Sequence, residues 1–142
     1  MASDGAREGR PEEKEVVEKL RQSVLDSIDW DCKVETLFRK DNLGCGQAVS
    51  GAIGWFFNQE KEGIILEDDC LPSQSFFSFC EELLNKYKDN KKVWHISGNQ
   101  FVPRFDDGAS YYFAIIQHVW GWASWADRWK FYEFDLKNYD EK

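Results

Sequence analysis

The stretch Gly63-Ile64-Ile65-Leu66-Glu67-Asp68-Asp69-Cys70 decides the fold of this chain, because an apolar run ends there abruptly in three carboxylates. Apolar runs of this kind are typical of buried strands in parallel sheets that are covered on both faces. Ligands of such sheets bind beyond the carboxyl ends of the strands. A cation or a sugar hydroxyl would relieve the repulsion between adjacent carboxylates. The stretch therefore predicts a ligand site, and a solvated acidic turn before a helix at Pro72 and Ser73 is the alternative.

The composition is that of one globular domain with a core, since 42% of the 142 residues are hydrophobic and 31% are charged. A net charge of -8 argues against nucleic acids and anionic membranes as partners. No apolar stretch approaches the roughly 20 residues of a membrane span, and Met1 is not followed by the apolar segment of a signal peptide. We therefore expect a cytoplasmic protein.

The cysteine pattern agrees with that expectation. Cys32, Cys45, Cys70 and Cys80 include no Cys-x-x-Cys pair of the kind that marks metal sites. We expect four reduced thiols, as in most cytosolic proteins, with one disulfide pair as the alternative.

Periodicity along the chain predicts strands that alternate with helices, which indicates an α/β sheet. One helix is expected from Pro11, with an apolar stripe that ends at Ile28. The other expected helices span residues 47–58, 75–87 and 122–132. The expected strands span residues 34–38, 64–66, 93–97 and 111–116.

The stretch from Tyr111 to Phe134 holds ten of the 23 aromatic residues. Aromatic side chains fill cores and interfaces, which is the role we expect for most of these, and they also stack on sugar rings. Trp120 and Trp122 flank Gly121, where a backbone can approach a ligand closely. We therefore select these two tryptophans for a binding role.

Three segments together resemble glycosyltransferases of the GT-A type, which use nucleotide-sugar donors, and in particular bacterial proteins related to N-acetylglucosaminyltransferase I. Leu37-Phe38-Arg39 with Asn42-Leu43-Gly44-Cys45-Gly46-Gln47-Ala48 is similar to the arginine and asparagine-glycine loop beside the nucleotide. Ile65-Leu66-Glu67-Asp68-Asp69 is similar to the metal-binding acidic motif. Val119-Trp120-Gly121-Trp122-Ala123-Ser124-Trp125 resembles the glycine-tryptophan segment on the acceptor side.

The resemblance implies a Rossmann-like GT-A fold, with a mostly parallel sheet flanked by helices, as a single domain over residues 1–142. It also implies an incomplete domain, truncated at the N-terminus and at the C-terminus, because the family places a strand before the Ser-Asp-Gly turn at Ser3. The strand at 34–38 is then expected either to pair directly with 64–66 or to borrow an edge from a second copy. Self-association is therefore expected.

Site residues follow from the same resemblance. Asp69 would ligate Mn²⁺ or Mg²⁺, for which carboxylate oxygens are suitable ligands. The implied donor-binding residues are Asp4, Arg39, Asn42, Gly44, Glu67 and Asp68. The implied acceptor-side residues, with sugar stacking, are Trp120, Gly121 and Trp122. The catalytic base is unknown, with Asp127 and Asp135 as candidates. An ordinary turn residue at Asp4 and a surface ion pair at Arg39 remain the alternatives.

The expected function is metal-dependent transfer of a sugar from a UDP- or GDP-sugar to a glycan or lipid-linked acceptor, in which a carboxylate deprotonates the acceptor hydroxyl. The first alternative is a nucleotidyltransferase, although the chain has neither a lysine-rich phosphate loop nor a Walker motif. The second is a non-catalytic remnant that binds a nucleotide-sugar or a glycan. For residues 1–142 alone, we expect weak donor binding and no sugar transfer.

Overall fold

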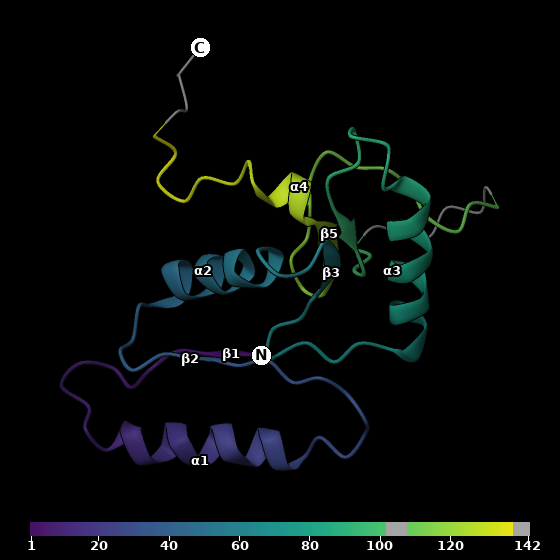
Figure 1. Cartoon of the computed structure of the whole chain (residues 1–142). Helices are drawn as coiled ribbons and strands as arrows, with labels where there is room; N and C mark the ends of the chain where they lie inside the picture. The colour runs from purple at the N-terminus through teal and green to yellow at the C-terminus, as the bar shows by residue number, and fades with distance from the viewer. Residues whose placement is uncertain (102–107, 138–142) are drawn as a thin grey trace. The chain divides into compact units, whose positions relative to one another are not determined.

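The computed structural model describes residues 1–101 and 108–137 (Figure 1). The chain forms two compact units, Met1–Trp55 and Phe56–Lys142. Both units combine short strands with helices, so the chain is mixed α/β as predicted, with one parallel two-stranded sheet and one antiparallel three-stranded sheet. None of the helices in the described ranges is long and apolar enough to cross a bilayer.

The first unit contains the strands β1 (Ala2–Ser3) and β2 (Leu37–Phe38), the helix α1 (Glu13–Asp26) and most of α2 (Cys45–Phe57). The two strands pair in parallel, with Ala2 opposite Leu37. Gly5 continues this contact, since its N–H donates to the carbonyl of Asp41 over 3.2 Å. A Cβ atom at Gly5 would stand 2.4 Å from the carbonyl oxygen of Lys40, so the close approach of the two chains requires glycine.

Arg21 is the buried residue of α1. Its guanidinium donates to the carbonyls of Asp4 at 3.0 Å and Arg39 at 2.7 Å, and therefore ties the helix to both strand ends. Much of the apolar stripe that the sequence predicts on this helix is exposed, at 64% for Val16 and 59% for Leu20, whereas Val17 is half-buried. Polar contacts rather than apolar burial hold this helix to its sheet.

The second unit contains β3 (Glu62–Ile65), α3 (Gln74–Tyr87), β4 (Ile96–Ser97), β5 (Trp122–Trp125) and α4 (Ala126–Trp129). The strand order is β3-β5-β4, and β5 is antiparallel to both neighbours. Because both outer strands run against β5, they run parallel to each other, and their carboxyl ends lie at the same edge of the sheet. The core of this unit consists of Phe76, Cys80, Leu83, Leu84, Ile96, Ala123 and Trp125.

The structure corrects three expectations about strands. Residues 122–125 form β5, and only 126–129 of the expected 122–132 helix are helical. Residues 111–116 form no strand, and most of their side chains are exposed. Every strand pair in the three-stranded sheet is antiparallel, whereas we expected parallel neighbours. Local patterns do not encode these outcomes, because strand pairing depends on partners that are distant in the sequence.

The expected direct pairing of 34–38 with 64–66 is also wrong. Within the described strands, β2 pairs with β1, whereas β3 pairs with β5. All four cysteines are free, as expected from their spacing. Burial in the core raises the pKa of the Cys80 thiol to about 11, so this side chain acts as a small apolar residue.

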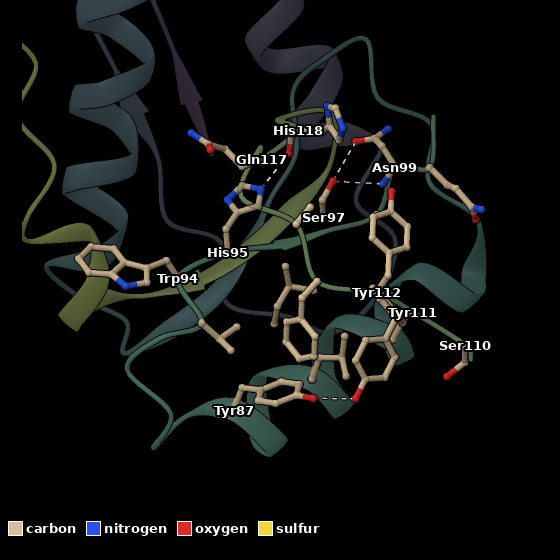
Figure 2. A pocket seen from close by; sticks show the side chains of 18 of the residues that line it. Tyr87, Trp94, His95, Ser97, Asn99, Ser110, Tyr111, Tyr112, Gln117 and His118 are labelled. Carbon is tan, nitrogen blue, oxygen red and sulfur yellow. Dashed lines mark hydrogen bonds between the residues drawn. The ribbon is translucent and has the colours of Figure 1, made fainter. Parts of the chain in front are cut away.

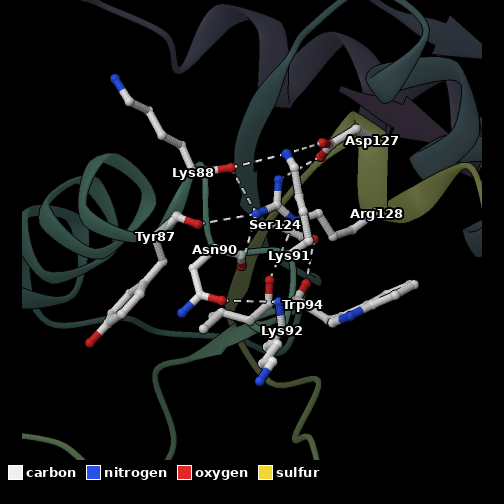
Figure 3. A network of polar contacts seen from close by, with 10 residues as sticks. Tyr87, Lys88, Asn90, Lys91, Lys92, Trp94, Ser124, Asp127 and Arg128 are labelled. Atoms are coloured by element: carbon white, nitrogen blue, oxygen red, sulfur yellow. Dashed lines mark hydrogen bonds and ion pairs between the residues drawn. The ribbon is translucent and has the colours of Figure 1, made fainter.

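Arg128 organises the loop between α3 and β4 (Figure 3). Its guanidinium donates to the carbonyls of Tyr87 at 3.1 Å and Lys88 at 2.9 Å, and it lies 4.1 Å from the ring centre of Trp125. Ser124 on β5 donates its hydroxyl to the carbonyl of Trp94 over 2.7 Å. Charged and polar side chains thus satisfy loop carbonyls that have no partner in the sheet.

Candidate functional site

The acidic run begins one residue after β3, behind Leu66, and forms a tight turn. The N–H of Cys70 donates to the carbonyl of Glu67 over 3.0 Å, so Asp68 and Asp69 are the central residues of this turn. Both aspartates are exposed. The Asp69 carboxylate has a long contact of 3.7 Å with the Cys70 thiol, which leaves its oxygens open to a ligand.

The turn lies beside the glycine-tryptophan segment. Ile65 is opposite Trp122 in the β3-β5 pair, and a Cβ atom at Gly121 would stand 3.4 Å from the side chain of Leu66. Gly121 has a φ of 77°, a conformation that glycine adopts without strain. Two segments that are far apart in the sequence therefore meet at one end of β3.

The carboxyl end of β4 joins the same edge of the sheet. The N–H of Gly98 donates to the carbonyl of Gly121 over 3.0 Å. Ser97 and Asn99 flank this contact, and the Ser97 hydroxyl accepts the N–H of Asn99 at 3.2 Å. Sequence reasoning missed these two polar residues. Their signal was the polar Ser-Gly-Asn triplet directly after an apolar strand, which is the pattern that drew attention to the acidic run.

The two tryptophans selected from the sequence differ in exposure. Trp120 is 53% exposed, as predicted for a ring that could stack on a sugar. Trp122 is only 6% exposed, and its ring stacks on His95 at a centroid distance of 4.7 Å. The sequence predicts an exposed ring at Trp120 or at Trp122, and Trp120 has it, whereas the Trp122 ring packs against His95 inside the unit.

His95 supports that packing as a neutral ring. Burial lowers its pKa, and its Nε2 lies 2.8 Å from the carbonyl oxygen of His118. A neutral imidazole with hydrogen on Nε2 donates to that carbonyl. His95 thus links β4 to the chain that leads into the glycine-tryptophan segment.

In the first unit, the structure brings together three of the expected donor-binding residues. The Asp4 carboxylate accepts the N–H of Leu43 through Oδ2 at 2.9 Å, and the Asn42 amide donates to the carbonyl of Gly5 at 3.0 Å. Asn42 Oδ1 accepts the N–H of Gly44, whose φ is 75°. Within the described residues, the buried Oδ1 atom of Asp4 has no hydrogen-bond partner. One oxygen of the Asp4 carboxylate therefore accepts a hydrogen bond from the chain, and the other is unpaired.

Arg39 is the fourth expected donor-binding residue of this unit. Its backbone N–H donates to the carbonyl of Ser3, and its half-buried side chain lies near α2, since a Cβ atom at Gly51 would stand 3.1 Å from the guanidinium. The ion pairs among the described residues do not involve Arg39, so its charge is available to a ligand.

The two candidates for the catalytic base are both ion-paired. Asp127 forms ion pairs with Lys91 and Arg128. Hydrogen bonds from these two side chains lower the pKa of Asp127, and the bond from Lys91 has the larger effect. A carboxylate with a lowered pKa is a weak proton acceptor, so Asp127 is a poor general base. Asp135 lies 2.6 Å from the ammonium of Lys137.

The spacing of the carboxylates determines which kind of metal site the chain can offer. Among residues 1–101 and 108–137, no group of three or more His, Cys, Asp or Glu side chains is placed to hold a metal ion. Magnesium-type ions in nucleotide sites need fewer protein ligands, because one or two carboxylates act together with substrate phosphates. The exposed carboxylates of Asp68 and Asp69 fit that requirement.

A pocket of about 800 Å³ lies in the second unit, between α3, the β4 region and residues 109–118 (Figure 2). At one end, Lys86 donates to the Tyr111 hydroxyl oxygen over 2.7 Å, and the hydroxyls of Tyr87 and Tyr111 are 2.7 Å apart. The Lys86 contact lowers the pKa of Tyr111, and the bond to Tyr111 raises the pKa of Tyr87. Either of the two hydroxyls can be the donor in the contact between the tyrosines.

Comparison of the chain with protein-family models, with curated proteins and with solved structures gives no match.

Proposed function

We propose that this chain is a Rossmann-like GT-A domain of a glycosyltransferase that transfers a sugar from a UDP- or GDP-sugar to a glycan or lipid-linked acceptor, with Mn²⁺ or Mg²⁺ as cofactor. One observation carries the proposal. The β3-β5 pairing sets the Glu67–Asp69 turn beside Gly121, and Trp120, which precedes Gly121 in the chain, has an exposed ring. A charged donor end and an aromatic surface for a sugar therefore share one edge of the sheet.

Each unit carries its own proposed donor-binding residues, the acidic turn in the second unit and the Asp4–Asn42 contacts in the first. In the proposed roles, Asp69 binds the metal ion, Asp68 the ribose and Glu67 the donor sugar. Asp4 accepts a hydroxyl or a base N–H through its unpaired Oδ1 atom. The buried position of that oxygen supports a ligand role, because a buried carboxylate oxygen without a hydrogen bond is costly.

The bound divalent ion would supply positive charge that stabilises the nucleoside diphosphate as it leaves. The chain's own contribution is to hold the donor. The Asn42–Gly44 loop is held by hydrogen bonds to Gly5 and within itself, so its backbone is ordered before a ligand arrives. Arg39 would add a positive charge for the base or a phosphate.

A second candidate is a non-catalytic module that binds a nucleotide-sugar without transferring it. The ion pairs of Asp127 and Asp135 favour this function, since each candidate base is held by a cation. Donor binding is common to both functions, whereas acceptor-dependent release of the nucleoside diphosphate belongs to the enzyme alone.

Calorimetric titration of the purified chain with UDP- and GDP-sugars, with and without Mn²⁺, tests the donor site. We expect binding that depends on Mn²⁺ and that Asp69→Asn abolishes without a change in circular dichroism. Asp89→Asn is the matched control, because Asp89 is an exposed carboxylate of the same unit outside the acidic turn. Equal nucleotide affinity for Asp69→Asn and the parent chain at saturating Mn²⁺ would refute the assignment.

A further inference from the structure

The described lining of the pocket beside α3 carries no carboxylate, although the chain is strongly acidic, with 26 aspartates and glutamates. Lys92 is the lysine of that lining. A cation would find no carboxylate in the described part of this pocket, and a highly charged anion would meet a single ammonium group. The lining therefore favours a neutral ligand.

One wall of the pocket is aromatic and the opposite region is rich in amides and hydroxyls. Phe76 and Phe79 of α3, with Tyr111 and Phe113, supply ring surface, and the Tyr111 ring meets Phe79 edge-on at 6.4 Å. Ser97, Asn99, Gln100 and Gln117 supply the polar groups. A sugar ring has the matching character, with an apolar face of C–H groups and a rim of hydroxyls.

The adjacent residues Tyr111 and Tyr112 lie in the aromatic region and in the polar region of the pocket, respectively. Tyr111 reaches Tyr87 on α3, whereas Tyr112 lies on the side of the pocket where Ser97 and Asn99 are found (Figure 2). Tyr111 accepts a hydrogen bond from Lys86 and shares one with Tyr87 in which either hydroxyl can donate, so the Tyr111 hydroxyl remains able to exchange a hydrogen bond with a ligand. The Tyr112 ring is 49% exposed and can lie against a ligand.

Asn99 connects the pocket to the edge of the sheet at which the acidic turn lies. Its Oδ1 atom is 3.4 Å from the Ser97 hydroxyl, and its side-chain NH₂ carries two hydrogens that can be donated to a ligand. The pocket volume of about 800 Å³ falls in the range of small-molecule sites, about 300–1,000 Å³. Room for more than one sugar ring is therefore present next to Asn99.

We propose that this pocket binds a neutral oligosaccharide, with rings against the tyrosines and hydroxyls on Asn99 and Tyr111. The proposal of saccharide binding depends only on the lining and volume of the pocket. The further step, that this saccharide is the acceptor of the sugar transfer, rests on the proposed function.

The test uses the full chain and a panel of neutral disaccharides, namely lactose, maltose, mannobiose and chitobiose, followed by amide chemical shifts in NMR. We expect at least one of them to shift the amides of Tyr111, Tyr112 and Asn99. Asn99→Ala and Tyr112→Ala should each weaken that binding about three- to tenfold, because each removes one polar or stacking contact. Phe134→Ala is the control, since this exposed aromatic residue does not line the pocket.

No shift with any disaccharide at about 10 mM would overturn the pocket proposal, and so would equal affinity in parent and variants. Tyr112→Phe replaces Tyr112→Ala if the alanine variant fails to fold, with unchanged ring packing and a loss limited to the hydroxyl. Disaccharide binding without any Mn²⁺-dependent nucleotide binding would refute the proposed function and leave the pocket standing. Nucleotide binding that Asp69→Asn abolishes, without disaccharide binding, would refute the pocket proposal and leave the proposed function standing.

Discussion

Each of the two units is built around a buried arginine that donates to backbone carbonyls, but the surroundings of the two arginines differ. Arg21 joins α1 to the ends of β1 and β2 in a unit whose buried apolar residues are Ala48 and Ile53. Arg128 joins the end of α3 to the loop before β4, and its guanidinium lies over Trp125 in a core cluster of seven residues.

The comparison separates two ways of positioning functional residues. In the first unit, hydrogen bonds place Asp4 and Asn42, while much of the apolar stripe of α1 remains exposed. In the second unit, a hydrophobic core fixes β5, and this strand in turn aligns the acidic turn with Gly121. We expect the first unit to open at a lower free energy than the second, because little of its apolar surface is buried.

The largest effect is expected from Arg128→Met. This change removes the guanidinium donor from the carbonyls of Tyr87, Lys88 and Asn90, each of which keeps one other donor, and it uncovers the ring of Trp125. We expect a loss of about 3 kcal/mol in the free energy of unfolding, measured by urea denaturation. Hydrogen exchange should accelerate throughout the second unit.

Arg21→Met is the matched change in the first unit. It should cost less, about 1–2 kcal/mol, with faster exchange confined to α1 and the two short strands. Arg10→Met serves as the control, because that side chain is 58% exposed, and its effect should stay within about 0.5 kcal/mol. A larger loss for Arg21→Met than for Arg128→Met would show that the first unit is the better-packed one.

Substitution of close-packed glycines gives a second comparison of the two units. Gly5→Ala would place a Cβ atom 2.4 Å from the backbone carbonyl of Lys40, and Gly98→Ala would place one 2.5 Å from the ring of Phe76. A ring can tilt more easily than two backbones can separate. We therefore expect about 2 kcal/mol of destabilisation for Gly5→Ala and about 1 kcal/mol for Gly98→Ala.

Thermal unfolding of the two glycine variants, followed by circular dichroism, measures the difference. If the proposed role of Asn42 holds, Gly5→Ala should also weaken nucleotide binding, because it displaces the loop that Asn42 holds to Gly5. Equal destabilisation by the two changes would mean that the Phe76 ring cannot move away from a new Cβ atom any more easily than the backbone at Lys40 can.

The elements that could be predicted are those whose residues carry their own periodicity. The helix at 75–87 was predicted within one residue, because Phe76, Cys80, Leu83 and Leu84 recur on one face. The strand 62–65 was predicted from its apolar run with a shift of one to two residues. These signals depend on neighbours in the sequence and need no knowledge of distant partners.

The failures concern segments whose state is set by distant partners. Trp125 and Trp129 are four residues apart, which favoured a helix, but all four residues of β5 are buried, so no alternation marks the strand. The site was missed in part for the same reason. Gly98 and Leu66 both approach Gly121 only because β5 pairs with both β3 and β4.

The smallest expected effect concerns His95, which couples the stability of the second unit to pH. Burial lowers its pKa in the folded chain, so the unfolded chain takes up a proton first as the pH falls. Stability should be full above about pH 6.5, the ordinary value for histidine, and should decrease below it until the folded-state pKa is reached. Urea midpoints between about pH 7.5 and 5.5 measure this dependence of stability on pH.

In His95→Phe, the ring can still stack on Trp122 but cannot titrate, so the variant should be less stable overall and should lose the dependence on pH. His118→Phe, which leaves the backbone carbonyl of His118 as the acceptor for His95, is the matched control and should retain the dependence on pH. A dependence on pH that persists in His95→Phe would belong to another group.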